Sequence, residues 1–303
     1  KWQGDLGNMI LRRGVERASA KRIEQQLSLQ ESVLAQFVGP QVIEDVAIIG
    51  LDPYMNHGAA IGILFQAKNT ELLAQDLIRQ RRTALTKFSD ATESTVRIAD
   101  RDVSLIATPG GEVRSYYIAD GDFHLVTTSK RLAQRFIQAG QGERPLAASV
   151  GFLGVRQRLA VERPDAVFGY VSPEFFRELT SPAIWIESQR RARSAREAKV
   201  LSLARWQANA EAVAVATRDE LIAAGLLPAG FGARADGGVL AETETGFTDS
   251  LRGAPGLFLP VSEVEVAAPE QGGAGIGEAV GSVGSEGGVG QHHARRGRRT
   301  AFA

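Results

Sequence analysis

His124 is the histidine whose neighbours in the sequence could do chemistry. Asp122 lies two residues before it, and hydroxyl side chains occupy positions 127 to 129. A nucleophile, a general base and an orienting carboxylate could be assembled from these residue types. On a strand, residues two apart share a face, so Asp122 and His124 point together, whereas Ser129 lies at the strand's end. Asp122 and His124 are therefore the candidate catalytic pair, although a histidine satisfied within a sheet is the favoured interpretation.

Neither a metal nor a cofactor is expected. His57 lies in the turn of residues 52–58, where a hydrogen-bonding role is favoured over a ligand role, and His292 and His293 are adjacent in a glycine-rich tail. Cysteine is absent, which excludes disulfides, thiolate catalysis and sulfur-ligated zinc. The sequence also lacks the signatures of P-loop nucleotidases, zinc peptidases and serine hydrolases.

The segment Gly272–Gly281, GGAGIGEAVG, is similar to a phosphate-binding loop. A dinucleotide fingerprint needs a helix after the glycines and an acidic residue about 20 positions on. Here the glycines continue, no apolar helix follows, and that position falls in the basic run of residues 292–299. We therefore expect no nucleotide there and predict that residues 267–303 form a disordered, Gly- and Arg-rich tail. Its composition is typical of a shifted reading frame in GC-rich DNA, and we hypothesise that residues from about 270 onward are a frameshift product.

Six Arg or Lys residues fall between positions 190 and 205, on a helix expected to run from Pro182 to about residue 216. Such a helix could bind anions or nucleic acid, with Arg190 and Arg191 as candidate residues. At 100° per residue, however, its basic side chains point around most of the helix. The favoured interpretation is a solvated face with local ion pairs, for example Glu187 with Arg190 or Arg191. No nucleic-acid partner is therefore expected.

The apolar and small residues of this helix share one side of it. Because small residues permit close approach, that side predicts packing against another helix. The residues are Trp185, Ala192, Ala195, Leu203, Trp206, Ala210 and Val213.

The composition is that of a soluble globular protein with a sizeable core, since 44% of the 303 residues are apolar and 23% are charged. Lys plus Arg equals Asp plus Glu at 35 each, so no global field favours nucleic acid or an anionic membrane, and such binding requires a local patch. No apolar run reaches the length of a transmembrane helix. Because the chain begins at Lys1, we expect an internal piece of a longer protein.

The apolar patterning predicts an α+β fold. We expect helices over residues 9–38, 70–88, 129–139 and 150–159, and the Ser-Pro pairs Ser172-Pro173 and Ser181-Pro182 predict two further helix starts. Short apolar runs between turn residues predict a hairpin at 46–65, a four-stranded antiparallel meander at 95–128, a strand at 166–171 and a hairpin near 237–245.

A short pattern also repeats 59 residues apart. LAQDLI at Leu73–Ile78 and LAQRFI at Leu132–Ile137 each follow a hairpin whose turn contains Gly58 or Gly121. The repeat indicates two related strand-turn-strand-helix units, with coincidence as the alternative. If the units are related, we expect one antiparallel sheet with both helices on one face.

Four regions follow from this pattern. Residues 1–38 form an amphipathic helix that continues an upstream segment, and residues 39–172 form the duplicated sheet domain. Residues 173–266 are mainly helical, contain a small hairpin and pack on the first domain. Residues 267–303 are the tail.

The middle of the chain resembles a family of large, exported bacterial envelope proteins of unknown function. The resemblance covers about residues 37–265 and rests on several segments. They are Phe37–Pro40 through Asp52-Pro53, Gly58–Lys68, Arg114–Tyr117, Asp120–Ser129, Tyr170–Phe176, Ser181-Pro182, Glu187–Arg191 and Asp249–Gly253. It implies an extracytoplasmic or periplasmic location and other envelope proteins, or the rest of a longer chain, as partners. It brings no activity and no catalytic residue.

The sequence therefore favours a non-enzymatic module of a bacterial envelope protein, acting in binding or structural support. Arg114 and Tyr116, within one of the resembling segments, join Arg190 and Arg191 as candidate binding residues. The alternatives are an envelope hydrolase that uses Asp122 and His124, and an anion- or nucleic-acid-binding protein that uses the Arg-rich helix 182–216.

Overall fold

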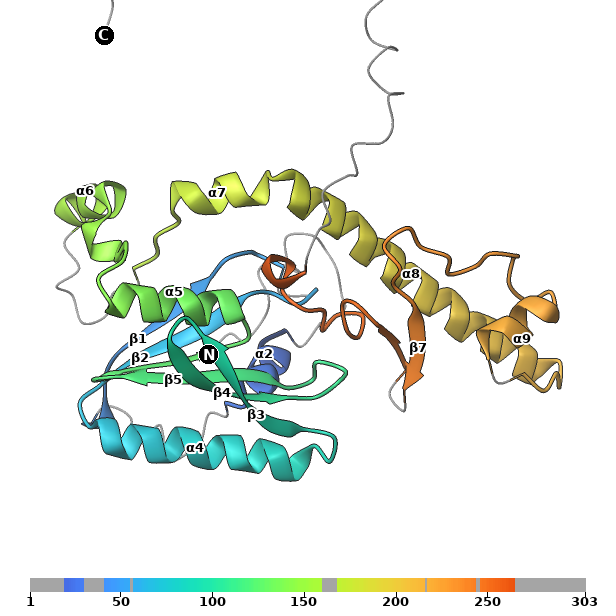
Figure 1. Ribbon diagram of the computed structural model, residues 1–303, viewed down its shortest axis with the longest axis horizontal. Helices are drawn as coiled ribbons and strands as arrows, with labels where there is room; N and C mark the ends of the chain where they lie inside the picture. The colour runs from blue at the N-terminus through green and yellow to red at the C-terminus, as the bar shows by residue number, and fades with distance from the viewer. Residues whose placement is uncertain are drawn as a thin grey trace, which may run out of the picture. The chain divides into compact units, whose positions relative to one another are not determined.

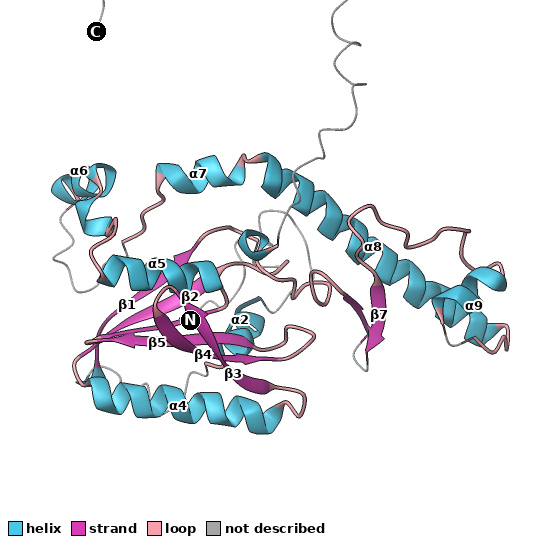
Figure 2. Cartoon of the chain, viewed as in Figure 1, coloured by secondary structure: helices cyan, strands magenta, loops and turns pink. Residues whose placement is uncertain are grey.

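The fold is α+β, as expected, with a six-stranded antiparallel sheet, helices around it and a long helix after it (Figure 1). The computed structural model describes residues 19–29, 41–54, 57–159, 168–215, 217–243 and 246–264. The predicted tail, 267–303, lies outside these residues. Figure 2 shows the strands gathered in the sheet and the helices beside it.

The sheet has the strand order β1-β2-β6-β5-β4-β3. Its strands are β1 (Ile43–Gly50), β2 (Ile61–Ala67), β3 (Thr92–Ile98), β4 (Arg101–Ala107), β5 (Arg114–Asp120) and β6 (Phe123–Thr127). The predicted hairpin corresponds to β1 and β2, and the predicted meander corresponds to β3 through β6, so both are confirmed. The hairpin joins the meander where β2 pairs with β6, with Leu64 opposite Leu125.

Helices cover both faces of the sheet, so the expectation that they share one face is wrong. Neighbouring residues of β6 show this: Leu125 packs with Ala133 and Ile137 of α5 (Lys130–Gly140). Val126 packs with Leu73 of α4 (Thr70–Lys87), and α2 (Ser19–Leu27) covers the same face. Figure 1 shows α5 and α4 on opposite sides of the strands. The cause is that the central strands carry continuous apolar runs rather than alternating ones, so both faces have to be covered.

The first described helix ends earlier than predicted. The apolar pattern favours one helix over residues 9–38, but α2 ends at Leu27 because Ser28 adopts the left-handed conformation, with φ of 57°. The Leu29 N–H then donates to the Glu24 carbonyl, as in a Schellman ending. The rest of the predicted helix lies outside the described residues.

The second half of the chain is mainly helical. Its elements are α6 (Val150–Arg158), α7 (Pro173–Leu179), α8 (Pro182–Ala210), α9 (Arg218–Ala223) and the hairpin of β7 (Leu240–Thr243) and β8 (Gly246–Asp249). Short 3-10 helices lie at Leu146–Ala148 and Val261–Glu263. The strand predicted at 166–171 is wrong over its described part, because residues 168–171 pair with no strand of the described chain.

The starts of α7 and α8 follow the predicted Ser-Pro signal. The Ser172 hydroxyl accepts the Phe175 N–H, and the Ser181 hydroxyl accepts the Ile184 N–H at 3.3 Å, with proline in the first turn of each helix. We expect Ser181→Ala to lower the free energy of unfolding by about 1 kcal/mol, because one N–H at the helix start loses its acceptor. Urea unfolding measures this. Ser188→Ala, inside the same helix, is the control and should leave stability within about 0.5 kcal/mol.

Candidate functional site

The long helix α8 buries a polar face. Glu187, Arg191, Ser194 and Glu197 recur every three or four residues and are all buried. The side predicted to pack on another helix is instead exposed: Trp185 is 67% exposed, and Leu203 and Trp206 are exposed as well. The prediction failed because polar residues in ion pairs occupy the first half of the buried side. In the second half of that side, Leu201, Ala204 and Ala208 pack with Leu221 of α9.

Glu187 is the centre of this buried face. Its side chain has no exposed area, and Arg252 is 1% exposed. The Glu187 carboxylate accepts hydrogen bonds from Arg252 at 2.7 and 3.2 Å and from Arg191 at 3.2 Å. The predicted pair of Glu187 with Arg191 is therefore confirmed, but it is buried rather than solvated. One carboxylate between two arginines leaves a surplus positive charge, which further carboxylates have to balance.

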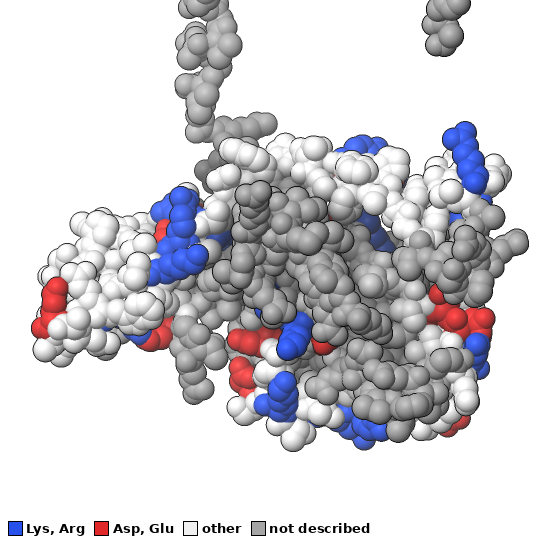
Figure 3. Space-filling model, turned by 180° about the vertical axis from the view of Figure 1, so that it is seen from behind, with Lys and Arg blue, Asp and Glu red and all other residues white. Residues whose placement is uncertain are grey.

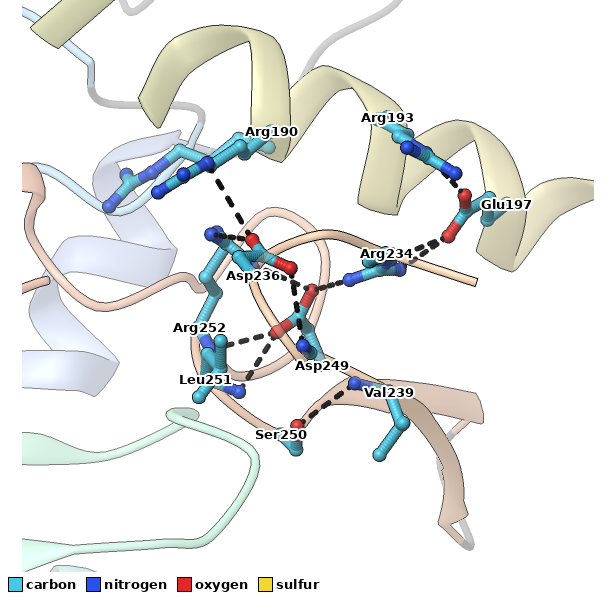
Figure 4. A network of polar contacts seen from close by, with 12 residues as sticks. Arg190, Arg193, Glu197, Arg234, Asp236, Val239, Asp249, Ser250, Leu251 and Arg252 are labelled. Atoms are coloured by element: carbon cyan, nitrogen blue, oxygen red, sulfur yellow. Dashed lines mark hydrogen bonds and ion pairs between the residues drawn. The ribbon is translucent and has the colours of Figure 1, made fainter. Parts of the chain in front are cut away.

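Those further carboxylates come from the segment after α9 (Figure 4). Asp236 accepts from Arg252 at 2.5 Å. Asp249 lies 3.5 Å from Arg252 and forms an ion pair with Arg234. Arg234 also donates to Glu197 at 2.6 and 2.8 Å, which returns the chain of contacts to α8.

We call this set the arginine network. It consists of Glu187, Arg190, Arg191, Arg193, Glu197, Arg234, Asp236, Asp249 and Arg252. Four carboxylates and five guanidinium groups share one partly closed region, with most of their charges removed from water.

The local structure around Asp249 orients two members of the network. Its Oδ1 accepts the backbone N–H groups of Leu251 at 2.9 Å and Arg252 at 3.1 Å, which forms a tight turn at the end of β8. This turn directs the Arg252 side chain back toward Glu187. The resembling segment Asp249–Gly253 contains this turn, but no spacing in the sequence indicates that it meets Glu187, 65 positions away.

The network holds its charges in place. Burial lowers the pKa of Arg252, but hydrogen bonds and charge from Glu187 and Asp236 outweigh it, so that pKa is raised. Burial raises the pKa of Asp249, but the Ser194 hydroxyl, the Leu251 N–H and Arg234 outweigh it, so that pKa is lowered. Groups shifted in these directions stay ionised and exchange no protons near neutral pH. The arrangement is suited to fixing α8 against the segment after α9 rather than to acid–base catalysis.

Arg191 connects the arginine network to the β1–β2 loop of the sheet. Its guanidinium donates to the His57 carbonyl at 2.9 Å and to the Leu259 carbonyl, and it lies over the Phe258 ring. Asp52, in the same β1–β2 loop, is buried and accepts the Ala60 N–H at 3.0 Å. Burial raises the pKa of Asp52, although its backbone hydrogen bonds and Arg191 oppose that shift. Arg191 therefore joins three parts of the chain: the β1–β2 loop, α8 and residues 252–263.

The candidate binding residues Arg114 and Tyr116 are both buried, and Arg114 contacts the segment of residues 252–263 that Arg191 also contacts. Arg114 donates to the Phe258 carbonyl at 3.4 Å, and the carboxylate of Glu263 contributes a nearby negative charge. Glu263 accepts the Lys130 N–H at the start of α5. Burial raises the pKa of Tyr116 to about 12. Arg114 therefore anchors the segment 252–263 to the sheet, Tyr116 packs in the sheet core, and neither is presented to solvent.

Asp122 and His124 do not meet as a catalytic pair. The Asp122 carboxylate accepts the Thr70 hydroxyl at 2.9 Å. His124 has no exposed area, and its Nδ1 lies 3.0 Å from the Tyr117 hydroxyl, while its Nε2 has no hydrogen-bond partner among the described residues. The hydroxyls of Thr127 and Thr128 donate to backbone carbonyls of the β1–β2 hairpin, and Ser129 caps α5. His124 is thus a histidine buried within the sheet, with one ring nitrogen beside the Tyr117 hydroxyl.

His124 should give a pH-dependent stability. Burial lowers its pKa below the usual 6.5, with Asp122 opposing in part. As the pH falls below 6.5, the unfolded chain takes up this proton before the folded chain does, so stability from His124 is complete above 6.5 and is lost as the pH falls through the folded pKa. We expect the free energy of unfolding of the wild type to fall more steeply than that of His124→Asn between about pH 7 and pH 5. Urea unfolding at several pH values measures the difference, and parallel profiles would contradict it.

A cleft of about 450 Å³ lies between α2 and α4. It is lined by Lys21, Glu24, Gln25, Ser28, Leu29, Gln80, Ala84, Lys87 and Phe88. None of these is Asp122 or His124, so the cleft does not open on the predicted pair. Within the described ranges, no group of three or more His, Cys, Asp or Glu side chains could hold a metal ion.

The basic residues of α8 divide into two sets. Arg190 lies 3.7 Å from Asp236, Arg193 donates to Glu197 at 2.8 Å, and Arg205 forms an ion pair with Glu242. Arg196 and Lys199 are exposed on the opposite side of the helix. That side also carries Trp185, Val200, Leu203 and Trp206, all exposed. We call it the outer face of α8. The two carboxylates of the helix, Glu187 and Glu197, are both buried away from it.

Comparisons with known proteins give no match. No protein-family model, no curated protein and no solved structure matches this chain. None of the helices in the described part of the chain is long and apolar enough to cross a membrane.

Proposed function

We propose that the chain is a non-enzymatic binding module of a bacterial envelope protein, and that the outer face of α8 is its binding surface. The observation that carries this proposal is the division of α8 into two sides. One side is fixed by the buried arginine network, and the other exposes two tryptophans, a leucine and basic residues. Large exposed apolar side chains on one side of a rigid helix are typical of an interaction site.

The arginine network supports this proposal because it fixes the position of α8, the helix that carries the proposed binding surface. Its contacts reach the β1–β2 loop through Arg191 and the end of β8 through Arg252. A helix held at several points along its length keeps its exposed side chains in fixed relative positions. Such preorganisation lowers the entropic cost of binding.

The hydrolase alternative has less support. His124 is fully buried, and its nearest hydroxyl belongs to Tyr117 rather than to a serine or threonine. A general base has to lie within hydrogen-bond reach of the proton that it removes, and a tyrosine in the core is a poor nucleophile. Burial also raises the pKa of Tyr117, which disfavours its phenolate.

The anion-binding alternative also has less support. Arg190, Arg191 and Arg193 are the basic residues nearest the start of α8, and all three contact carboxylates of the network. On the face displayed in Figure 3, the coloured Lys and Arg side chains are interspersed with Asp and Glu. A nucleic-acid surface requires a continuous basic stripe.

The proposed function can be tested with isolated bacterial envelopes. The purified full chain is mixed with washed envelopes and sedimented, and its bound fraction is compared with that of Leu203→Ser/Trp206→Ser. We expect the variant to lose most of the binding, because two large exposed side chains leave the outer face. Val150→Ser is the matched control, because Val150 is also highly exposed but lies on α6.

Equal sedimentation of the wild type and the outer-face variant would contradict the proposal. Turnover of a chromogenic ester by the purified chain, abolished in His124→Asn, would favour the hydrolase instead. The melting temperatures of all variants establish that each is folded.

A further inference from the structure

We infer that the outer face of α8 lies on an anionic phospholipid surface, with its tryptophans and leucine in the headgroup region. This inference rests on the proposed function and names the partner of the same surface. It is carried by the apolar residues of the outer face, by the signs of its charges and by the order of these residues along the helix.

The large apolar residues lie toward the two ends of the outer face, with Trp185 near the start of the helix and Val200, Leu203 and Trp206 near its end. Trp185 and Trp206 are 67% and 69% exposed, and Leu203 is 58% exposed. The two tryptophans lie 21 positions apart, which on an α-helix is about 31 Å and nearly six turns, so they point in similar directions. Tryptophan is enriched at membrane interfaces because its ring is apolar and its indole N–H remains hydrated. Two such rings at the ends of one face would hold the helix parallel to a membrane.

The charges of the outer face have one sign. Arg196 and Lys199 are exposed between the tryptophans, and both glutamates of α8 are buried in the arginine network. The fold thus removes every carboxylate of the helix from this face. Basic side chains reach the headgroup level while their aliphatic stems cover apolar surface, and each is attracted by anionic lipid.

The order of residue types along the outer face favours a lipid over a protein partner. A protein interface places its apolar residues in a core depleted of lysine and surrounds it with a polar rim. On α8 the order along the helix is instead tryptophan, basic residues, leucine and tryptophan, so Arg196 and Lys199 lie within the apolar stripe. Tryptophan, leucine, arginine and lysine are residue types that occur on interfacial helices. A fluid lipid surface accommodates this order of residues without requiring a matching pocket for each side chain.

Vesicle sedimentation tests the inference. The full chain is used with Arg295, Arg296, Arg298 and Arg299 changed to Ser, because these tail residues could themselves bind anionic lipid. We expect this variant to bind vesicles that contain both phosphatidylglycerol and phosphatidylcholine at least tenfold more tightly than vesicles of phosphatidylcholine alone. The difference should disappear as the salt concentration is raised. Equal binding to both vesicle types would overturn the inference without requiring any further variant.

Charge variants locate the contact on the outer face. We expect Arg196→Gln/Lys199→Gln to weaken binding to the anionic vesicles on the order of tenfold, because two lipid-facing charges are lost. Arg82→Gln/Lys87→Gln removes the same charge from exposed positions of α4 and should bind as the parent does. Equal weakening by both pairs would indicate general electrostatic attraction and would overturn the assignment to α8.

Tryptophan fluorescence then reports insertion. The chain has three tryptophans, so Trp2→Phe leaves Trp185 and Trp206 as the emitters. Brominated phosphatidylglycerol should quench them and shift their emission to the blue, and an unchanged spectrum would overturn the inference. If the chain binds envelopes through the outer face but does not bind vesicles, the proposed function stands and the lipid inference fails. If it binds neither, both fail.

Discussion

Glu187→Gln should lower the free energy of unfolding by about 3–5 kcal/mol, the largest loss expected from a single charge in this chain. The substitution keeps the size of the side chain but leaves Arg191 and Arg252 without the carboxylate between them. Both guanidinium groups are almost completely removed from water, so hydration cannot replace Glu187. Urea unfolding followed by circular dichroism measures the change.

Glu242→Gln is the matched control. It removes one carboxylate from an ion pair with Arg205, but the Glu242 side chain is half exposed, so we expect a change below about 1 kcal/mol. Similar losses for the two variants would mean that burial of the arginine network adds nothing to stability. That result would mean that the arginine network does not fix α8.

Gly58→Ala should destabilise the chain by about 3 kcal/mol and release residues 252–263 from the sheet. Gly58 has a φ of 88°, a conformation that L side chains rarely adopt, and a Cβ there would lie 1.7 Å from the Phe258 carbonyl oxygen. The Phe258 backbone therefore has to move, and with it the acceptors of Arg114 and Arg191. Trypsin, which cleaves after arginine, should then cut at the normally buried Arg252.

Gly142→Ala distinguishes the backbone strain of a positive φ from the close contact with Phe258. Gly142 has a similar φ of 84°, but nothing lies within 4 Å of its Cβ position. It should therefore show only the backbone strain of about 1 kcal/mol and no new cleavage at Arg252. If Gly142→Ala and Gly58→Ala behaved alike, the close contact with Phe258 would have no energetic weight.

The sequence was informative wherever the signal was local. Asp120-Gly121 predicted the turn between β5 and β6, and Ser172-Pro173 and Ser181-Pro182 predicted two helix starts, because these depend on a few neighbouring residues. The meander was predicted for the same reason. The end of α2 at Leu27 was not, since the left-handed Ser28 that ends the helix is not a glycine.

The candidate site depended on contacts that no local pattern contains. Glu187 and Arg191 were recognised as a pair because they are four residues apart, but Asp236 and Arg252 join them from another part of the chain. Local spacing also could not show that His124 would be buried beside Tyr117, seven residues away across a hairpin. The apolar side of α8 was assigned to the interior because ion pairs rarely hold the buried face of a helix.

The arginine network also bears on the order in which the chain folds. Its contacts join residues far apart in sequence, with Arg252 65 positions from Glu187 and Arg191 134 positions from the His57 carbonyl that it binds. Contacts of such separation form late, because the closing of long loops has to precede them. During synthesis, the buried carboxylates of α8 have no partners at Arg234 and Arg252 until the ribosome has released those residues. The contacts of α8 with Arg234 and Arg252 therefore form after the contacts within the sheet, and the unfolding rate rather than the folding rate should respond to changes in the network.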